Sequence, residues 1–228
     1  MLVREWMSSP VITVGLHDDM QHAIDLMTDY HVSMLPVMKE GTLVGIVTDR
    51  DLKRAAPSHV ALLEIKQILY HMRRVEISAI MTEAPLTVRP DTTLEEAAEV
   101  LLTNKISGCP VVTEDGALVG VITKNDIFKA IISLSGLRKK GLQYGLLLED
   151  RPGAIKEVTD IIRKFGGRLV SIMTSYDRAP EGFRHVYIRA FNLPRGQIQE
   201  IENEIREKGK LLYVVDHRDD KRRIFSDS

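Results

Sequence analysis

The chain has 228 residues, 44% of them hydrophobic, which is long enough for two modest domains that each bury a core. Its 31 basic and 32 acidic residues leave a formal net charge of −1, so no general attraction to nucleic acid or to an anionic membrane is indicated. The single cysteine, Cys109, rules out an internal disulfide; with neither a signal-peptide pattern nor a run of ~18 apolar residues, we expect a cytoplasmic location.

Residues 1–60 predict a small module with the element order βαββα. Apolar runs are typical of its strands, and apolar residues at helical spacing are typical of its helices. The expected elements are a strand at 11–14, a helix opened by Asp18 and Asp19, strands at 34–38 and 43–47, and a helix that stops at Pro57. The methionines of the first helix share their face with no Cys or His at ligand spacing, so they predict core packing.

Residues 61–76 predict a joining helix. Apolar residues recur at helical spacing from Leu62 to Met72, and such a stripe needs a partner, either between paired modules or across a dimer seam. His59 and His71 lie in and beside this segment, but no third ligand follows at a recognisable spacing, so no metal site is predicted.

Residues 77–136 repeat residues 1–60. The phrase Gly45-Ile46-Val47-Thr48-Asp49-Arg50-Asp51 returns as Gly120-Val121-Ile122-Thr123-Lys124-Asn125-Asp126. Upstream, Met7 matches Met81 and Pro36-Val37 matches Pro110-Val111. A period of this length is too long for a solenoid unit, so it predicts two copies of a module packed as a pseudo-dimer.

Each repeated phrase ends where a strand is expected to meet a helix, and two interpretations of its threonine and aspartate stay open. Thr48 and Thr123 can be helix N-caps, with Asp51 and Asp126 placed favourably in the helix dipole. Alternatively, the hydroxyl and the carboxylate bind a ligand, because ligands collect at strand-to-helix corners of α/β sheets.

The repeated residues resemble the cystathionine-β-synthase (CBS) domain, a βαββα module that works in pairs. The resemblance covers roughly residues 1 to 136 and rests on the start at Met7 and Met81, the apolar-Pro-Val strand and the Gly-x-x-Thr-x-x-Asp end, each present twice. It implies two clefts between the repeats that bind an adenosine-containing ligand such as AMP, ADP, ATP or S-adenosylmethionine. In that family the aspartate holds the ribose hydroxyls and the threonine lies near ribose and phosphate. One implied cleft joins Ile12, Val32, Ser33 and Met34 to Thr123, Asn125 and Asp126, and the other joins Leu86, Ile106, Ser107 and Gly108 to Thr48, Arg50 and Asp51.

The sequence departs from this family at the phosphate. In AMP-sensing kinase subunits of the family, a basic pair precedes the apolar-Pro-Val strand, whereas here Ser33-Met34 and Ser107-Gly108 stand there. Arg50 lies inside one repeated phrase and the uncharged Asn125 inside the other. A guanidinium binds phosphate bidentately and an amide does not, so we expect two unequal clefts, of which the Arg50 cleft prefers a phosphate-bearing ligand.

Residues 137–141 predict an exposed basic linker, and residues 142–217 predict a second domain. The expected elements are a strand at 142–148, a helix at 154–165, strands at 168–176 and 183–191, a helix at 197–208 and a strand at 210–216. This βαββαβ order is the ferredoxin-like plan. Residues 218–228 form a charged tail that we expect to fray or to make a contact.

The turn at 150–153 gives the second domain its resemblance. The four residues Asp150, Arg151, Pro152 and Gly153, with the Ala and Ile that follow, resemble the ACT domain, a regulatory module that commonly senses amino acids. The resemblance implies a possible effector contact at this turn; the alternative is a tight strand-to-helix turn. A CBS pair followed directly by an ACT domain resembles acetoin-utilisation proteins of the AcuB type.

The sequence therefore predicts an α/β (α+β) protein, with tandem CBS modules in a pseudo-twofold pair followed by a ferredoxin-like ACT domain. No catalytic residues are predicted, because no histidine lies in a nucleophile motif and phosphate-loop, HExxH and CxxC motifs are missing. The leading hypothesis is a homodimeric regulatory protein that senses an adenosyl ligand, without a required cofactor or metal, and whose ACT domain senses an amino acid or mediates oligomerisation. The resemblance links it to acetoin utilisation. A small metabolic enzyme acting on a nucleotide and an interaction or transcription-associated scaffold are the alternatives; the latter lacks a helix-turn-helix signal and a basic face.

Overall fold

The computed structural model describes residues 1–56 and 72–225, and the chain divides into two compact units, Met1–Phe128 and Lys129–Ser228. Each unit is treated by itself. The predicted stripe from Leu62 falls almost wholly on residues outside the described part, as do His59 and His71.

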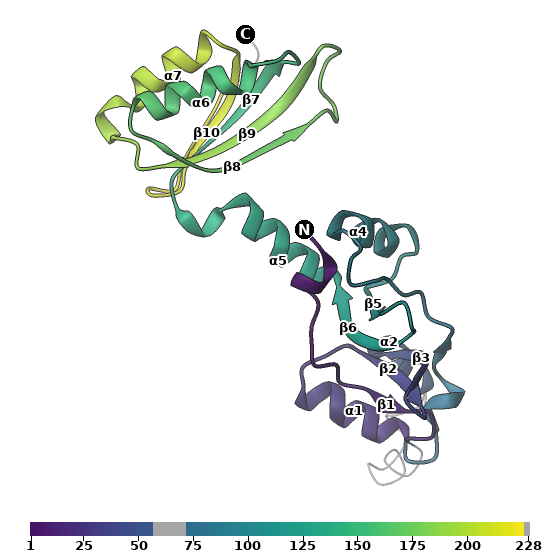
Figure 1. Ribbon diagram of the computed structural model, residues 1–228. Helices are drawn as coiled ribbons and strands as arrows, with labels where there is room; N and C mark the ends of the chain where they lie inside the picture. Colours follow the sequence, from purple (N-terminus) through teal and green to yellow (C-terminus); the bar gives the residue numbers. More distant parts are fainter. Residues whose placement is uncertain (57–71, 226–228) are drawn as a thin grey trace. The chain divides into compact units, whose positions relative to one another are not determined.

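The first repeat has the predicted βαββα order (Figure 1). Its elements are β1 (Val14–Gly15), α1 (Met20–Asp29), β2 (Met34–Lys39), β3 (Thr42–Thr48) and α2 (Asp49–Ala55), preceded by the 3-10 turn η1 (Val3–Glu5). Asp19 begins α1 as its N-cap, accepting a hydrogen bond from the His22 amide at 2.8 Å. The strand expected at 11–14 is reduced to the two residues of β1.

The second repeat contains η3 (Ile77–Ala79), β4 (Thr82–Glu83), α4 (Leu94–Thr103), β5 (Gly108–Val112), β6 (Leu118–Thr123) and α5 (Lys124–Ser135). The counterpart of β1 is only an isolated parallel bridge between Val88 and Val111. Thr93 and Glu96 form a capping box that starts α4. The sheets have the strand orders β1-β2-β3-β4 and β5-β6.

The sheet of each repeat is extended by a segment from the start of the other repeat. β4, from the start of the second repeat, pairs antiparallel with β3 of the first, and Ser8 makes the equivalent bridge to Val121 in β6. The glycines of the repeated phrases permit this pairing: a side chain at Gly45 would collide with Met81, and one at Gly120 would collide with Met7. The predicted pseudo-dimer is therefore a pair of modules that exchange their leading segments.

Two clusters of buried residues hold the pair together. The core of the first repeat joins α1, β2, β3 and α2 and also takes in Ile77 from η3. A smaller cluster crosses the pair and contains Met34, Ile46 and Val121, with Val11 packed against it. The second cluster forms the seam between the repeats.

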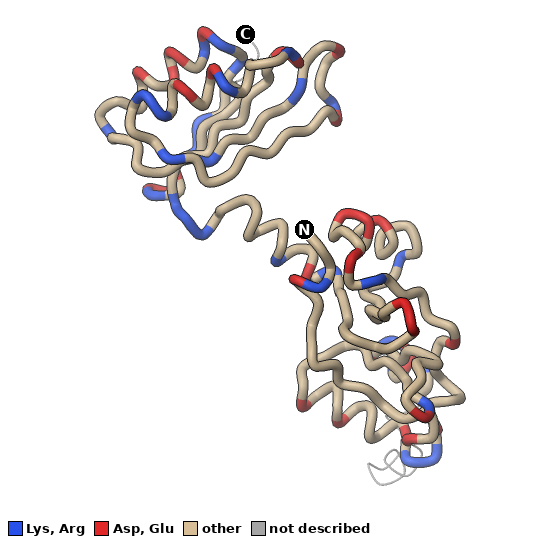
Figure 2. The backbone as a smooth tube through the Cα atoms, viewed as in Figure 1, with Lys and Arg blue, Asp and Glu red and all other residues tan. Residues whose placement is uncertain are grey.

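The C-terminal unit has the predicted βαββαβ order, with one further strand. Its elements are β7 (Leu142–Glu149), α6 (Ala154–Lys164), β8 (Arg168–Ser175), β9 (Phe183–Phe191), η5 (Arg195–Gln197), α7 (Ile198–Arg206), β10 (Lys210–Asp216) and β11 (Lys221–Ile224). The sheet order is β11-β10-β7-β9-β8, and α6 and α7 cover one of its faces (Figure 1). Charged residues of both signs line α6, as its solvent-facing side requires (Figure 2).

Of the two expectations for the charged tail, fraying or a contact, the structure shows the contact. Lys221–Ile224 forms β11, and Arg223 reaches back to pair with the fully buried carboxylate of Glu202 on α7. Phe225 then packs against Arg206, whose guanidinium carbon lies 4.7 Å from the centroid of the phenyl ring.

The expected linker is partly ordered into secondary structure, because Leu137–Lys139 forms the 3-10 turn η4. Among the described residues, no helix combines the length and apolarity needed to cross a membrane.

Candidate functional site

The two Thr–Asp corners have nearly identical geometry. Thr48 ends β3 and is the N-cap of α2; its hydroxyl donates to Oδ2 of Asp51 at 2.6 Å and its amide to the same oxygen at 3.0 Å. Thr123 and Asp126 repeat both bonds at 2.6 and 3.0 Å where β6 meets α5. The capping interpretation is thus present in both copies.

Burial distinguishes the two corners. Asp126 is only 4% exposed, whereas Asp51 is half-buried. Arg50 and Asn125 occupy equivalent exposed positions in the first turns of α2 and α5. In the repeated phrases themselves, the residue before the aspartate is thus an arginine at the first corner and an asparagine at the second.

The strands place the serines next to the corner of their own repeat. Met34 is the cross-strand partner of Thr48, and the Ser33 carbonyl accepts the Asp49 amide at 3.0 Å. In the second repeat, Gly108 pairs with Thr123 and the Ser107 carbonyl accepts the Lys124 amide at 2.9 Å. The sequence analysis groups Ser33 with Thr123 and Ser107 with Thr48, across the two repeats, and these groupings stay predictions.

The seam brings the two repeats together at these strand starts. A Cβ atom at Gly108 would lie 2.8 Å from Cε of Met34, so Met34 of the first repeat covers Gly108. Gly108 is the residue of the second repeat that is equivalent to Met34. Met34 itself is 6% exposed. Since Met34 pairs with Thr48 and Gly108 pairs with Thr123, one corner lies on each side of this contact.

The remaining predicted cleft residues differ in their surroundings. Ile12 and Val32 are half-buried and pack against the core of the first repeat, and Ile106 is half-buried. Leu86 is 49% exposed.

The sequence analysis identified Met34 as a ligand contact but missed its packing role across the seam. It also missed the contacts of Met81 with Gly45 and of Met7 with Gly120. The signal was available, because those methionines and glycines recur together in the repeat.

Metal ligands and the cysteine thiol are the other groups for which the sequence sets an expectation. Within residues 1–56 and 72–225, no cluster of three or more His, Cys, Asp or Glu side chains could hold a metal ion. Cys109 is 1% exposed in β5, and burial raises the pKa of its thiol to about 11, which keeps it protonated and unreactive near neutral pH.

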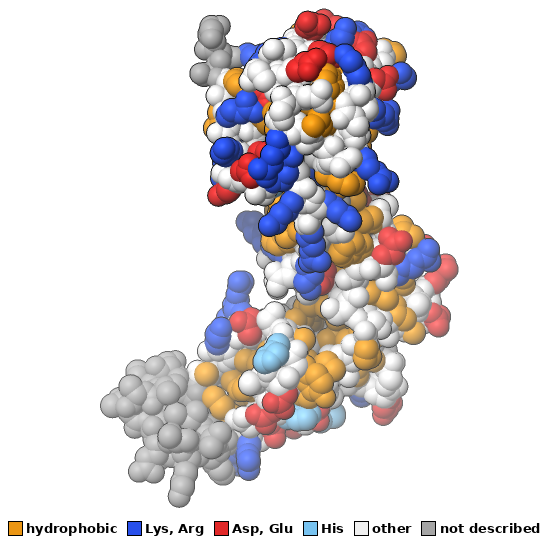
Figure 3. All heavy atoms as spheres, turned by 90° about the vertical axis from the view of Figure 1, so that its left-hand side faces the viewer, with side chains coloured by type: hydrophobic (Ala, Val, Ile, Leu, Met, Phe, Trp, Pro, Cys, Tyr) orange, Lys and Arg blue, Asp and Glu red, His pale blue; other side chains and the backbone are white. Residues whose placement is uncertain are grey.

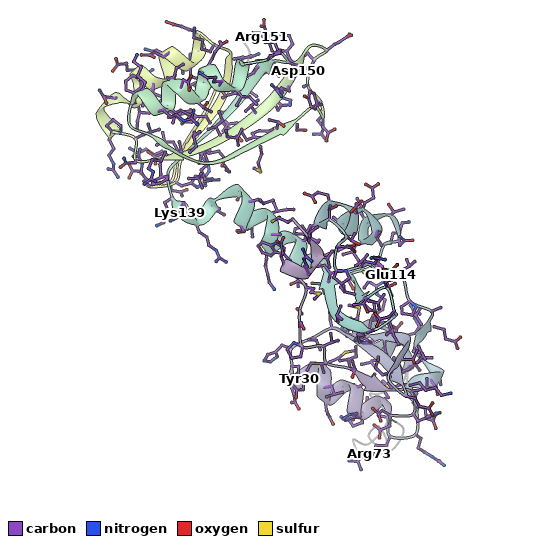
Figure 4. The ribbon with its side chains drawn as sticks, viewed as in Figure 1. Tyr30, Arg73, Glu114, Lys139, Asp150 and Arg151 are labelled. Atoms are coloured by element: carbon purple, nitrogen blue, oxygen red, sulfur yellow. The ribbon has the colours of Figure 1, made fainter. Side chains whose placement is uncertain are left out.

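The turn at 150–153 is tied to its surroundings by ion pairs. Arg151 donates bidentately to Glu157 at 2.7 and 2.9 Å and also to Glu149 at 3.1 Å, while Asp150 lies 3.5 Å from Arg184. Asp150 and Arg151 lie together at one end of the C-terminal unit (Figure 4). Gly153, just after Pro152, has φ of 89° and begins α6, a conformation that favours glycine. The tight-turn interpretation therefore accounts for these residues.

A hollow borders this turn. It is lined by the apolar Leu147, Pro180 and Phe183 and by charged side chains that include Arg151, Glu157 and Lys208. Carboxylates already hold Arg151, so its guanidinium would have to exchange partners to bind an effector.

Two βαββα repeats with exchanged leading segments and a Thr–Asp corner in each define a paired α/β module. Residues 3–58 and 77–133 match the family model of the CBS domain. The chain is 30% identical over 134 residues to a CBS domain-containing protein of Dictyostelium discoideum, a match that covers 58% of this chain and 92% of that protein. The chain belongs to the CBS-domain family.

Solved structures include a similar pair. The CBS-pair protein CBSX2 from Arabidopsis thaliana matches with a TM-score of 0.51 and 31% identity, over 57% of this chain and 94% of that one. CBSX2 has also been crystallised in complex with AMP (30% identity, TM-score 0.48, 57% and 96% covered). Inosine-5'-monophosphate dehydrogenase of Korarchaeum cryptofilum is 36% identical over 118 residues, which are 52% of this chain but 22% of that enzyme. The matched family residues end at 133, before the C-terminal sheet begins.

Proposed function

We propose that this chain is a regulatory protein that binds an adenosine-containing ligand, AMP, ADP, ATP or S-adenosylmethionine, at the Thr–Asp corners of its CBS pair. The duplicated corner is the observation that supports the proposal. Both bonds from Thr48 use Oδ2 of Asp51, and Oδ1 has no partner among the described residues, so it can accept a ribose hydroxyl while the cap stays intact. The similar protein CBSX2 is known in complex with AMP.

A thermal-shift screen tests the ligand class. AMP, ADP, ATP, S-adenosylmethionine and amino acids are added singly, because a ligand that binds only the folded state raises the melting temperature by mass action. Guanosine monophosphate is the control for the base. If GMP raises the melting temperature as much as AMP does, or if no adenosyl compound raises it, the proposal is refuted. Hydrolysis of ATP above a protein-free blank would instead favour the alternative of a nucleotide enzyme.

The two clefts should be unequal. Arg50 supplies a guanidinium at the Asp51 corner, where the other corner has Asn125, and a charge-assisted bidentate contact is roughly twice as strong as a neutral hydrogen bond. Calorimetry with AMP should resolve a tighter and a weaker site, and Arg50→Ala should weaken the tighter one by about tenfold. Arg54→Ala, in the last turn of the same helix, is the matched control. Two equal sites that ignore Arg50→Ala would contradict the inequality.

We further propose that the C-terminal unit is an ACT domain that senses an amino acid or mediates oligomerisation, as in AcuB-type proteins linked to acetoin utilisation. Its βαββαβ order and the glycine turn into α6 support this. If it is a sensor, one amino acid in the screen raises the melting temperature, and Arg151→Ala abolishes that shift. If none of the twenty amino acids changes the melting temperature, the domain is not such a sensor, and oligomerisation is the role to test.

We also propose a homodimer. Helix α5 exposes Phe128 at 59%, Ile131 at 50% and Leu134 at 49%, a spacing that places all three along one side of the helix. Light scattering at micromolar concentration should give the mass of a dimer, and Ile131→Glu should give a monomer. Leu102→Glu on α4, where the leucine is 73% exposed, is the control and should leave the dimer intact. A wild-type monomer would end this proposal.

A further inference from the structure

A separate cavity of about 260 Å³ lies within the C-terminal unit, where α7 begins beside β10 and β11. Its apolar wall is Ile198 and Val214. Cations reach it from two elements, Arg195 of η5 and Lys221 with Arg223 of β11, and Asp216 and Asp219 complete the lining. The hairpin between β10 and β11 lies on the side of the unit that faces the viewer in Figure 3, where Lys and Arg side chains gather with fewer acidic ones.

The carboxylates around this cavity are all engaged. Arg218 chelates Asp216 with bonds of 2.9 and 2.7 Å, and Arg195 donates to Asp219 at 2.9 Å. Arg223 binds the buried Glu202 through both terminal nitrogens. Of the four surrounding cations, Lys221 alone has no carboxylate partner in the part of the chain that the structure describes. The cavity therefore has one unneutralised positive charge.

A buried tyrosine whose hydroxyl has no partner lies next to the cavity's apolar wall. Tyr144 is the cross-strand neighbour of Val214 on the helix-covered face of the sheet, and it is 0% exposed. Its hydroxyl has no hydrogen-bond partner among the described residues, although such groups are nearly always satisfied when buried. Val214, its cross-strand neighbour, lines the cavity, and burial raises the pKa of the Tyr144 phenol. The phenol stays protonated at neutral pH and is available as a donor.

The start of α7 adds to the positive potential. This nine-residue helix has no side-chain N-cap, and neither has η5 before it. Uncapped amides at a helix N-terminus favour a negative charge nearby. Arg195 and Ile198, which begin the two helical segments, both line the cavity.

We propose that this cavity binds a small aliphatic carboxylate, with its anionic head beside Lys221 and the Tyr144 hydroxyl and its alkyl part against Ile198 and Val214. One unneutralised cation matches one carboxylate. The apolar wall distinguishes an organic acid from an inorganic anion, which would leave that wall wet. This site is distinct from the Thr–Asp corners and from the turn at Arg151.

Calorimetry on the full chain at constant ionic strength tests the proposal, with sodium butyrate as the probe. Butyrate should bind saturably, while butanol, which lacks the charge, and inorganic phosphate, which lacks the alkyl part, should bind at least tenfold more weakly. Lys221→Gln should weaken butyrate binding by about tenfold, the effect of one charge-assisted hydrogen bond. Arg222→Gln is the matched control, because Arg222 is the next residue of β11, pairs with Asp220 and does not line the cavity.

Tyr144→Phe provides a second measurement. Removing an unpartnered buried hydroxyl should leave the melting temperature of the ligand-free protein unchanged or higher, but should weaken butyrate binding several-fold. AMP binding should be the same in all three variants. Absence of saturable butyrate binding, equal binding of butanol or phosphate, or equal losses in Lys221→Gln and Arg222→Gln would each overturn the proposal.

Discussion

Replacing Asp126 by alanine should destabilise the ligand-free protein more than the equivalent change at Asp51. Each carboxylate accepts the amide and hydroxyl of its threonine, so each substitution removes two hydrogen bonds from a helix start. Loss of such a cap costs about 1 kcal/mol, with a range of roughly 0.5–2. Asp126 is 4% exposed whereas Asp51 is half-buried, so water substitutes less readily for the bonds lost at Asp126, and its cost falls toward the upper end.

Thermal unfolding followed by circular dichroism measures this difference. For a unit of this size, 1 kcal/mol corresponds to a shift of roughly 4 °C, so Asp51→Ala should lower the transition by about 4 °C and Asp126→Ala by up to about 8 °C. Glu99→Ala is the control, because that carboxylate is exposed on α4 and makes no cap. Calorimetry with AMP on the same variants then measures ligand binding separately from stability.

Two results would refute this reasoning. Melting temperatures within a degree of the wild type would mean that the observed capping bonds contribute nothing, and a larger loss at Asp51 than at Asp126 would mean that burial does not set the cost. A destabilised variant that also loses one AMP site would show that the same carboxylate serves both as cap and as ligand contact. That outcome would join the two interpretations that the sequence leaves open.

Three further outcomes follow from packing and charge. Gly108→Ala should cost about 1–3 kcal/mol, because its Cβ would lie 2.8 Å from the Ile122 carbonyl oxygen, whereas Gly196→Ala should be neutral, since nothing lies within 4 Å; equal denaturant midpoints would contradict this. At pH 8, iodoacetamide should alkylate Cys109 at least about a hundredfold more slowly in the native than in the unfolded protein, because burial raises the thiol pKa to about 11 from 9.0 and the neutral thiol prevails below that value; rapid native labelling would show an open β5. Glu202→Ala should destabilise the C-terminal unit by about 2–3 kcal/mol, less than a fully buried pair because Arg223 is 45% exposed; an unchanged urea midpoint would mean that β11 is not held by this pair.

The sequence was most informative where a pattern repeats. Duplication of Gly, Thr and Asp identified two modules, and the alternation of strand and helix periods gave the βαββαβ order of the C-terminal unit, because both signals are local. The exchange of leading segments was not predicted. The exchange depends on whether β4 pairs with β3 of the first repeat or with the similar strand β6 of its own repeat. The sequence contains no local signal for that choice.

Tertiary contacts also determine the structure of the tail and the backbone contacts of the strand starts. The run from Arg218 to Arg223 has the composition of a solvated segment, yet Glu202 offers Arg223 a buried partner that only the folded α7 supplies. The Ser33 carbonyl accepts the Asp49 amide of its own repeat, a contact that the sequence did not indicate, while the grouping of Ser33 with Thr123 stays a prediction. Register depends on pairing across strands, which one chain read in order does not reveal.

Asymmetry in the seam bears on the expected inequality of the two corners. Met34 and Gly108 occupy equivalent positions, so in a symmetric pair the same residue type would meet itself across the seam. Two methionines there would overfill the space that Met34 alone now fills. A methionine beside Thr48 and a glycine beside Thr123 give the two corners different walls. Arg50 beside Asp51 and Asn125 beside Asp126 give them different charges. Shape and charge therefore differ between the same two corners, and a ligand that suits one corner meets both a different wall and a different electrostatic field at the other.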